Sequence, residues 1–264
     1  MHDIVSEMRL ATLKASKAVL DIYRRGFETK TKSDSSPVTD ADLASNRILK
    51  DRLGHFQGVG FLSEEEADDH SRLNYRQLFI VDPLDGTQDF VNHDDSFAIN
   101  VALVDDRHPL IGFVAFPYHQ TYCYAVRGMG SYYVDKEGKE TRLHVSDRLD
   151  DLIYLSSKMH ENQKEKDLVS FNQKKIREVI HAGASVKAYY LACGKGDASV
   201  RFTDMTKEWD VCAPELIVTE AGGIFLDTNL RPFEYNRMDV YNRDGYCMFN
   251  RKENEILLTA YEKK

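Results

Sequence analysis

The sequence contains little cysteine and no long apolar run. Its four cysteines, in a chain of 264 residues, stand far apart and form no Cys-x-x-Cys pair: Cys123, Cys193, Cys212 and Cys247. This spacing argues against a disulfide framework and indicates reduced, mostly structural thiols of a cytoplasmic protein. No stretch reaches the length that spans a bilayer. The first residues include acidic ones rather than an apolar run, so we expect neither a membrane partner nor a signal peptide.

Basic residues are also in the minority. Lysine and arginine number 35 against 43 aspartates and glutamates, which gives a net charge of −8. This balance argues against a nucleic-acid polymer as partner. An anionic ligand would have to be drawn in by bound metal and by a few local basic groups. The composition, 42% hydrophobic and 30% charged, is typical of a globular protein. The sequence shows no internal repeat and no low-complexity segment. Its length fits one large domain or two fused lobes.

Apolar periodicity predicts a first half that begins with helices and continues with strands. The predicted elements near the N-terminus are, in order, a helix over 4–25, a polar loop over 30–37, a helix from the N-cap Thr39 to Gly54, and a strand over 59–62. In the middle of the chain, apolar runs predict an antiparallel meander of strands over 97–104, 110–116, 122–126 and 132–134.

The second half alternates between helices and strands. The predicted elements are a helix near 165–180, a helix near 185–194, a strand near 197–202, a helix near 209–221 and a strand near 224–226. A polar stretch around 135–150 is the predicted seam between an N-terminal lobe, 1–145, and a C-terminal lobe, 146–264.

One hexapeptide carries the strongest chemical signal. Four apolar residues, 78–81, precede Asp82-Pro83-Leu84-Asp85-Gly86-Thr87. This pattern predicts a short buried strand that opens into a turn, so that both carboxylates lie at one place. Hard cations such as Mg²⁺ prefer oxygen ligands and usually keep phosphate and water as partners. The alternative is an ordinary turn, since Asp-Pro and Asp-Gly are common turn dipeptides.

Other acidic residues stand at the ends of predicted elements. Asp42 lies at a helix start, Glu64 and Glu65 follow a strand, and Asp210 follows Trp209 at a helix start. Each has a structural alternative: a first-turn residue favoured by the helix dipole for Asp42, a solvated charge run for the glutamates, and a helix N-cap for Asp210. If the fold gathers them, a bound cation is the simplest explanation, because buried carboxylates repel one another.

Five motifs, in order along the chain, resemble those of the lithium-sensitive, Mg²⁺-dependent phosphatases. This family includes inositol monophosphatase, 3′(2′),5′-bisphosphate nucleotidase and relatives of fructose-1,6-bisphosphatase. The motifs are 37–42 (PVTDAD), 63–65 (SEE), 82–87 (DPLDGT), 209–210 (WD) and 220–223 (EAGG). The resemblance extends from the first helix to about residue 250. It implies an α+β or α/β fold, a layered αβαβα sandwich with an antiparallel-rich first lobe and a mixed second lobe.

The resemblance also implies a metal site. It assigns two or three Mg²⁺ ions per site to the carboxylates and one backbone carbonyl of these residues: Glu64, Asp82, Leu84 (carbonyl), Asp85 and Asp210. It further implies inhibition by Li⁺ and a possible homodimer. Two metals can activate water and neutralise the leaving oxygen in an in-line displacement.

Catalytic and phosphate-binding roles follow from the same resemblance. Asp42 with Thr87 would orient and deprotonate the attacking water, and Glu65 would support the site through its water shell. The backbone N–H groups of Gly86 and Thr87 would hold the phosphate, which also agrees with the physics of helix starts. Attack would be direct, without a phosphoenzyme. A non-catalytic regulator on the same scaffold is the alternative from another class, and the presence of every catalytic position argues against it.

The substrate is indicated less directly. Ser185 and Lys187 are similar to the Ser-x-Lys element of bisphosphate nucleotidases, in which the lysine contacts the second phosphate. The alternative for Lys187 is an exposed lysine on a helix. The segment 88–90 (QDF) and Arg201, with Glu208, favour the same branch.

We therefore expect a phosphorylated small molecule as substrate, chiefly 3′-phosphoadenosine 5′-phosphate, with Asp210 among its contacts. An inositol monophosphatase or a broader sugar-phosphate phosphatase is the alternative. Two residues depart from the family pattern. Pro214 replaces a small residue in the helix after Trp-Asp, where we expect it in the first turn, and Gln88 replaces a basic residue.

Overall fold

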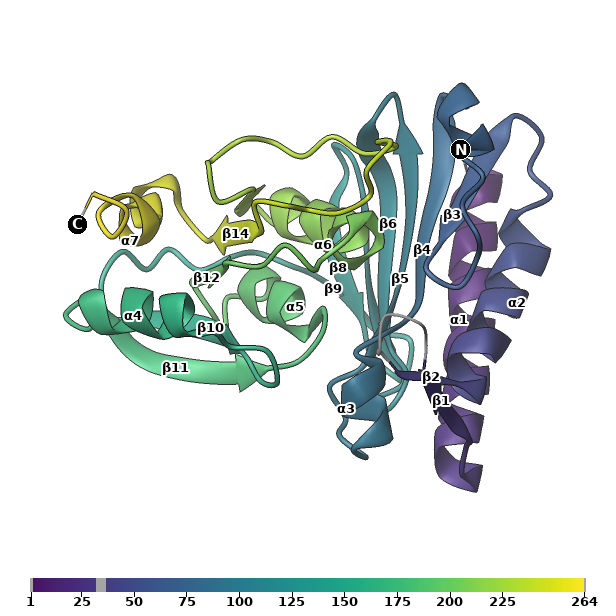
Figure 1. The fold of residues 1–264 in the computed structure, drawn as a ribbon, viewed down its shortest axis with the longest axis horizontal. Coiled ribbons are helices and arrows are strands. Elements are labelled where there is room, and N and C mark those ends of the chain that lie inside the picture. The colour runs from purple at the N-terminus through teal and green to yellow at the C-terminus, as the bar shows by residue number, and fades with distance from the viewer. Residues whose placement is uncertain (1, 32–36, 264) are drawn as a thin grey trace.

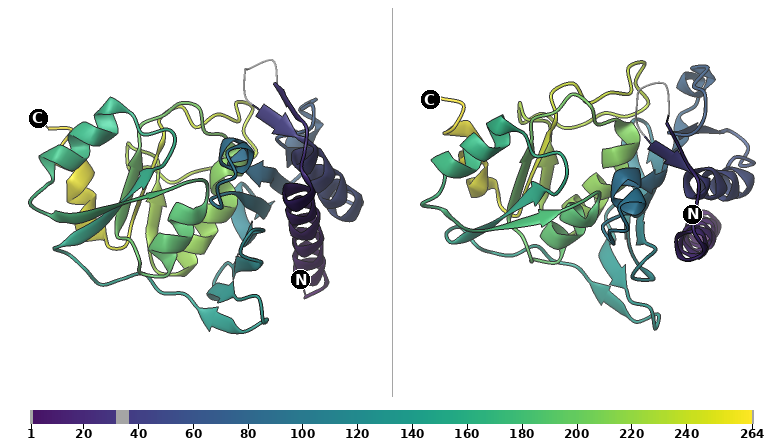
Figure 2. Two further views of the ribbon diagram at one scale, coloured as in Figure 1. Left: turned by 90° about the horizontal axis from the view of Figure 1, so that it is seen from below. Right: turned by 60° about the horizontal axis from the view of Figure 1, so that its bottom comes forward.

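The computed structural model describes residues 2–31 and 37–263 and arranges them in alternating layers (Figure 1). Helices α1 (His2–Arg25) and α2 (Asp40–Leu53) cover one face of a seven-stranded sheet. Helices α5 (Val186–Ala192) and α6 (Glu208–Glu220) lie between that sheet and a five-stranded sheet. Helices α4 (Gln163–Phe171) and α7 (Ile256–Thr259) pack on the outer side of the second sheet. The predicted αβαβα sandwich is confirmed, and the views in Figure 2 agree with it.

The first two helices form as the sequence predicts. Apolar residues recur every three or four positions along α1, and the face that they form is buried in the core: Met8, Ala11, Ala15, Val19 and Ile22. Helix α2 begins at the predicted N-cap, because the Thr39 hydroxyl accepts a hydrogen bond from the N–H of Ala41 at 3.1 Å. Asp42 completes the capping box by accepting from the N–H of Thr39 at 2.7 Å.

The predicted loop over 30–37 is wrong at its ends. Strands β1 (Thr29–Thr31) and β2 (Pro37–Thr39) pair there as an antiparallel ribbon. The rest of that predicted loop, 32–36, lies outside the described residues.

The seven-stranded sheet contains the predicted meander. Its strands are, in sheet order, β3 (Val59–Ser63), β4 (Gln77–Asp85), β5 (Ala98–Asp105), β6 (His108–Phe116), β7 (Thr121–Val126), β8 (Gly130–Val134) and β9 (Glu140–Arg142). Strands β3 and β4 run parallel, joined through the 3₁₀ turn η1 (Ser71–Asn74), and the other pairs are antiparallel. Both faces of the central strands are buried, because α1 and α2 cover one face and α6 the other.

The five-stranded sheet is mixed, as expected for the second half. Its strands, in sheet order, are β11 (Ile176–Ala182), β10 (Leu152–Ser157), β12 (Ala198–Arg201), β14 (Tyr246–Phe249) and β13 (Ile224–Leu226). Strand β10 is parallel to β11 and β12, and β14 is antiparallel to its two neighbours. The helix predicted near 165–180 is wrong beyond Phe171, where α4 ends and β11 soon begins.

Helix α6 packs closely on the first sheet. A Cβ atom at Gly112 of β6 would lie 3.2 Å from the carbonyl oxygen of Ala213, so glycine allows this approach. Pro214 is the seventh residue of α6, which corrects the expectation that it lies in the first turn. Proline has no N–H, so the carbonyl of Asp210 lacks the donor that a helix normally supplies four residues later. At the end of α6, Glu220 accepts hydrogen bonds from two backbone N–H groups of the β7–β8 turn.

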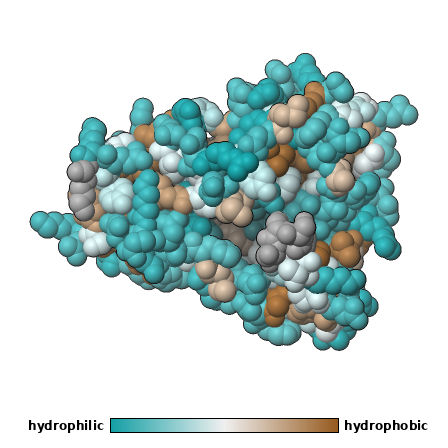
Figure 3. All heavy atoms as spheres, viewed as in Figure 1, coloured by the Kyte–Doolittle hydropathy of each residue, from teal (hydrophilic) through white to brown (hydrophobic). Residues whose placement is uncertain are grey.

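The surface and the cysteines agree with the composition. The four cysteines are free. The face in Figure 3 is mostly hydrophilic, with hydrophobic residues in small separate patches. Among residues 2–31 and 37–263, no helix combines the length and apolarity that a membrane crossing requires.

Candidate active site

A pocket of about 680 Å³ lies where the two halves of the chain meet. It is lined by the end of β4, by α3 (Thr87–Val91), by the start of α5 and by the start of α6. A volume of this size is typical of small-molecule sites. Most of the predicted site residues line it: Glu64, Asp82, Leu84, Asp85, Gly86, Thr87, Ser185, Lys187 and Asp210.

The end of β4 aims two carboxylates toward this pocket. The register with β5 shifts between Asp82 and Asp85, so the strand bulges at Pro83 and Leu84. A bulge redirects side chains that would otherwise alternate between faces. The N–H of Leu84 donates to Oδ1 of Asp82 at 3.1 Å, which holds the turn. Gly86 follows with φ of 87°, a conformation that favours glycine.

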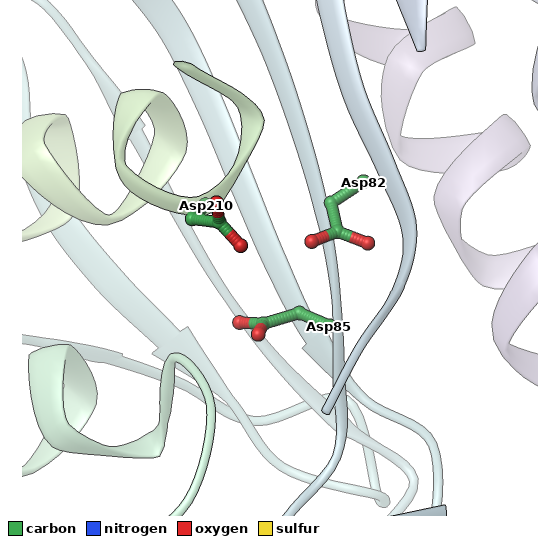
Figure 4. A group of neighbouring side chains, drawn as sticks. All are labelled: Asp82, Asp85 and Asp210. Carbon is green, nitrogen blue, oxygen red and sulfur yellow. The ribbon is translucent and has the colours of Figure 1, made fainter. Parts of the chain in front are cut away.

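Three aspartates converge in the pocket. One carboxylate oxygen from each of Asp82, Asp85 and Asp210 lies within 4.8 Å of the others (Figure 4). The pKa of Asp82 is raised well above its usual range, first by burial and then by the charges of Glu64, Asp85 and Asp210. Burial, followed by the charges of Asp85 and Glu64, raises the pKa of Asp210 to about 8. Asp82 is buried and the other two are half-buried, and carboxylate oxygens that repel one another in such a site suit a hard divalent cation.

The start of α6 places Asp210 in this cluster. The N-cap is Lys207, and Asp210 is the third helical residue, which corrects the N-cap alternative. The N–H of Lys207 donates to Oδ2 of Asp210 at 2.5 Å. Glu208 is fully buried and accepts hydrogen bonds from the N–H groups of Asn236 at 2.8 Å and Arg237 at 2.9 Å. These bonds attach the helix start to the loop before β14.

The side chains of Asp42, on α2, and Thr87, on α3, lie within hydrogen-bond distance of each other. Oδ1 of Asp42 lies 2.9 Å from the Thr87 hydroxyl, which also lies 3.1 Å from the carbonyl oxygen of Leu84. The other Asp42 oxygen accepts from the N–H and the hydroxyl of Thr39. Burial raises the pKa of Asp42. Asp42 itself is buried and does not line the pocket, so it reaches the pocket only through Thr87. A fixed carboxylate with a raised pKa can accept the proton of such a hydroxyl, which in turn can accept one from water.

The acidic loop after β3 is not a fully solvated charge run. Glu66 is half-buried, and its carboxylate accepts from Asn46 and from the ammonium of Lys50, both at 2.7 Å. Glu64 lines the pocket, and its charge raises the pKa values of the aspartates. Glu65 is half-buried in the same loop.

Ser185 and Lys187, at the start of α5, lie close to Asp85 in the same pocket. The Ser185 hydroxyl donates to Oδ2 of Asp85 at 2.5 Å. Lys187 is buried, which contradicts the alternative of an exposed helical lysine. Its ammonium donates to the carbonyls of Ala184 at 2.9 Å and Ala182 at 3.2 Å. Burial, then the charge of Arg201, lowers the pKa of Lys187 to about 8.

The structure adds residues that sequence reasoning weighed lightly or missed. Arg201 on β12 lines the pocket, is buried, forms an ion pair with Glu165 and donates to the carbonyl of His160 at 2.9 Å. His160 and Asn162, before α4, also line the pocket and were missed. No turn or period marks these two residues in the sequence. An arginine inside a predicted strand was a usable signal for Arg201.

The metal-free protein is expected to lose stability as the pH rises from about 4 to about 8. Asp210 has its pKa raised to about 8 from the ordinary 3.8, so in this window the folded state binds more protons than the unfolded state. The free energy of unfolding therefore falls with pH. Saturating Mg²⁺ should flatten this slope. Melting temperatures measured across this pH range, with and without Mg²⁺, check the prediction. A metal-free protein whose melting temperature rises with pH would contradict it.

These features define a site for a divalent cation and a phosphorylated small molecule. Three carboxylates converge in it, a glycine turn leads into the start of α3, and the cationic side chains of Lys187 and Arg201 line the same pocket.

The Inositol monophosphatase family model matches residues 2–263, and the chain belongs to this family. It is accordingly a metal-dependent phosphomonoesterase, which confirms the class predicted from the motifs. A 3′(2′),5′-bisphosphate nucleotidase CysQ from Aggregatibacter actinomycetemcomitans is 31% identical over 230 residues, which cover 86% of this chain and 85% of that protein. The CysQ of Escherichia coli strain K12 is 26% identical, covering 88% of this chain and 94% of its own length.

Solved structures agree with the fold. The crystal structure of CysQ from Bacteroides thetaiotaomicron matches with a TM-score of 0.82 and 28% identity, covering 95% of this chain and 98% of that chain. The IMPase of Thermotoga maritima shares the fold, with a TM-score of 0.81 at 22% identity, covering 100% of this chain and 98% of the other.

Proposed function

We propose that this protein is a 3′(2′),5′-bisphosphate nucleotidase that removes the 3′-phosphate of 3′-phosphoadenosine 5′-phosphate. The observation that carries the proposal is a pair of buried cations, Lys187 and Arg201, in the pocket that the aspartates line. A substrate with a second phosphate needs positive charge beyond that of the metal ions. The ammonium of Lys187 would supply it, and Arg201, which is paired with Glu165, adds guanidinium donors to the same pocket. The similarity to CysQ proteins supports the same substrate.

The residues present fit Mg²⁺. The proposed ligands are the carboxylates and the one carbonyl that meet at the β4 end, for two or three ions: Glu64, Asp82, Leu84 (carbonyl), Asp85 and Asp210. Bound Mg²⁺ would supply positive charge to the phosphoryl oxygens and lower the pKa of the attacking water. Inhibition by Li⁺, a cytoplasmic location and a homodimer belong to the same proposal.

The chain's own groups would bind and orient the reactants. The Thr87 hydroxyl would hold the attacking water in line with the phosphorus and take its proton while passing its own proton to Asp42, which lies behind it. The N–H groups of Gly86 and Thr87 would bind the phosphate. Asp210 would contact the substrate beside the leaving oxygen. Glu65 would support the site through its water shell.

Thr87→Val is expected to lower kcat by about 10²-fold or more, because it removes the hydroxyl that orients water while keeping the side chain's shape. KM and the affinity for Mn²⁺ should change little. Thr219→Val is the matched control, since Thr219 is exposed at the far end of α6 and its hydroxyl donates only within the helix. Equal kcat values for Thr87→Val and the wild type would contradict the assigned role.

A substrate panel tests the proposed function. Phosphate release with Mg²⁺ is measured on 3′-phosphoadenosine 5′-phosphate, adenosine 3′-monophosphate, inositol 1-phosphate and fructose 1,6-bisphosphate. The bisphosphate nucleotide should have the highest kcat/KM. A preference for inositol 1-phosphate or for the sugar bisphosphate by about tenfold would overturn the proposal and favour the alternative phosphatases.

A further inference from the structure

A buried asparagine lies beside the aspartate cluster. Asn100 is on β5, directly opposite Asp82 of β4 in the sheet, and is 1% exposed. Its neighbours along the strand, Ile99 and Val101, are buried apolar residues. A polar side chain in such a strand has to be hydrogen-bonded to offset its burial. The hydrogen-bond partners of Asn100 therefore indicate the role of its side chain.

The Asn100 amide reaches two parts of the site that are far apart in the sequence. Nδ2 donates to Oδ2 of Asp85 at 3.1 Å and lies 3.5 Å from the carbonyl oxygen of Trp209, a long hydrogen bond. Trp209 immediately precedes Asp210 in the first turn of α6. One amide group thus connects the β4 end to the helix that supplies the third aspartate.

The two oxygens of Asp85 are made unequal by these contacts. Oδ2 accepts from Asn100 and from the Ser185 hydroxyl, at 3.1 Å and 2.5 Å. Two donors satisfy this oxygen, which leaves Oδ1 as the better ligand for a cation. Carboxylates that bind metals are commonly held in this way by outer hydrogen bonds, and removing such a bond typically costs 10- to 100-fold in metal affinity.

The orientation of the amide is determined by its partners. A flipped amide would direct its oxygen at the Asp85 carboxylate and at the Trp209 carbonyl, both of which are acceptors. In the present orientation the Asn100 oxygen is buried, and no hydrogen-bond partner for it appears among the described residues. The orientation of the side chain is therefore set by the two acceptors of the site.

We propose that Asn100 is a positioning residue of the metal site. It fixes the rotamer of Asp85 and the distance between the β4 end and α6, and so places Oδ1 of Asp85 and the carboxylate of Asp210 for a shared cation. It touches neither substrate nor metal. The inference rests on the metal-dependent reaction of the family and is independent of which phosphate ester is the substrate.

Asn100→Ala is the test, with Mn²⁺ binding measured directly by calorimetry on the full chain. We expect the affinity for Mn²⁺ to fall 10- to 100-fold and the Mg²⁺ concentration for half-maximal activity to rise in parallel. Because the site is weakened and not removed, saturating Mg²⁺ should restore most of kcat. A variant with unchanged Mn²⁺ affinity would overturn the proposal.

Asn172→Ala is the matched control. Asn172 is also a buried asparagine, and its Nδ2 donates to two carbonyls, those of Leu168 at 2.9 Å and Leu257 at 2.8 Å, in the outer layer. Its substitution should lower the melting temperature and leave Mn²⁺ affinity unchanged. An equal loss of Mn²⁺ affinity in both variants would show a general effect of destabilisation and would overturn the proposal.

Ser185→Ala provides a second route if Asn100→Ala does not fold, because it removes the other donor to Oδ2 of Asp85. It should lower Mn²⁺ affinity as well, and an unchanged value would contradict the account of Asp85. The same titration separates two kinds of failure. A wild-type protein that binds no Mn²⁺ overturns the metal-dependent function itself, whereas normal binding by both variants overturns only the positioning role.

Discussion

Asp85→Asn is expected to lower kcat/KM by at least about 10³-fold while raising the melting temperature of the metal-free protein. The loss follows because Asp85 would hold a metal ion, and a bound metal ion contributes several kcal/mol of transition-state charge stabilisation; each 1.4 kcal/mol or so is tenfold in rate. The melting temperature should rise because the substitution removes one of several negative charges that repel one another. At Asp82 the pKa is raised first by burial and then by the charges of Glu64 and Asp85. Phosphate release and thermal unfolding in chelator measure the two effects.

Asp105→Asn is the matched control for this variant. Asp105 also ends a strand, β5, but its partner is the exposed Arg76 at 3.1 Å, outside the pocket. A surface ion pair of this kind contributes little to stability, so both activity and melting temperature should stay near the wild-type values. If Asp85→Asn retains activity, or if it is less stable than the wild type without metal, the metal site is misassigned.

Lys187→Met is expected to discriminate between substrates. The lysine ammonium has three N–H donors, and two of them are directed at the carbonyls of Ala182 and Ala184. The third remains for a ligand in the pocket. Loss of a hydrogen bond from a charged donor costs about 1.5–3 kcal/mol, so kcat/KM for 3′-phosphoadenosine 5′-phosphate should fall about 10- to 100-fold. Activity on adenosine 3′-monophosphate, which lacks the second phosphate, should fall much less.

The control for Lys187→Met is Lys195→Met, because Lys195 is exposed just after α5. It should have normal kinetics on both nucleotides. Melting temperatures are needed alongside, since Lys187→Met also removes the donor of two buried carbonyls. Equal losses on the two nucleotides would refute the role of Lys187 in binding a second phosphate, whatever the change in stability.

The parts of the fold that the sequence predicted are those with strong local signals. The Thr39 cap marks the start of α2, and the apolar run before Asp82 marks β4. The helix predicted near 165–180 extended too far because β11 is a half-exposed edge strand of mixed composition, whose pairing with β10 provides its order. Local pattern cannot show a pairing partner that is distant in the sequence. The division into lobes at 145 and 146 remains a prediction.

Site residues that stand in a sequence motif could be predicted, whereas residues that join the site only through tertiary contacts could not. Asp82 and Asp85 share one turn, so their proximity could be derived from the chain. Asp210 reaches them only because α6 packs across the sheet, and the motif resemblance, not the spacing, indicated it. Asn100 was missed although an asparagine within the apolar run over 97–104 was a usable signal. Its importance depends on the hydrogen bond to Asp85, which no sequence pattern contains.

The most direct test of the account is a titration of the chelated, full-length protein with Mg²⁺ while phosphate release from 3′-phosphoadenosine 5′-phosphate is followed. We expect no release without the ion, a saturable return of activity with it, and no return in Asp85→Asn at the same concentrations. Phosphate release that persists in chelator, or that returns equally in Asp85→Asn, would contradict a catalytic cation held by the converging aspartates.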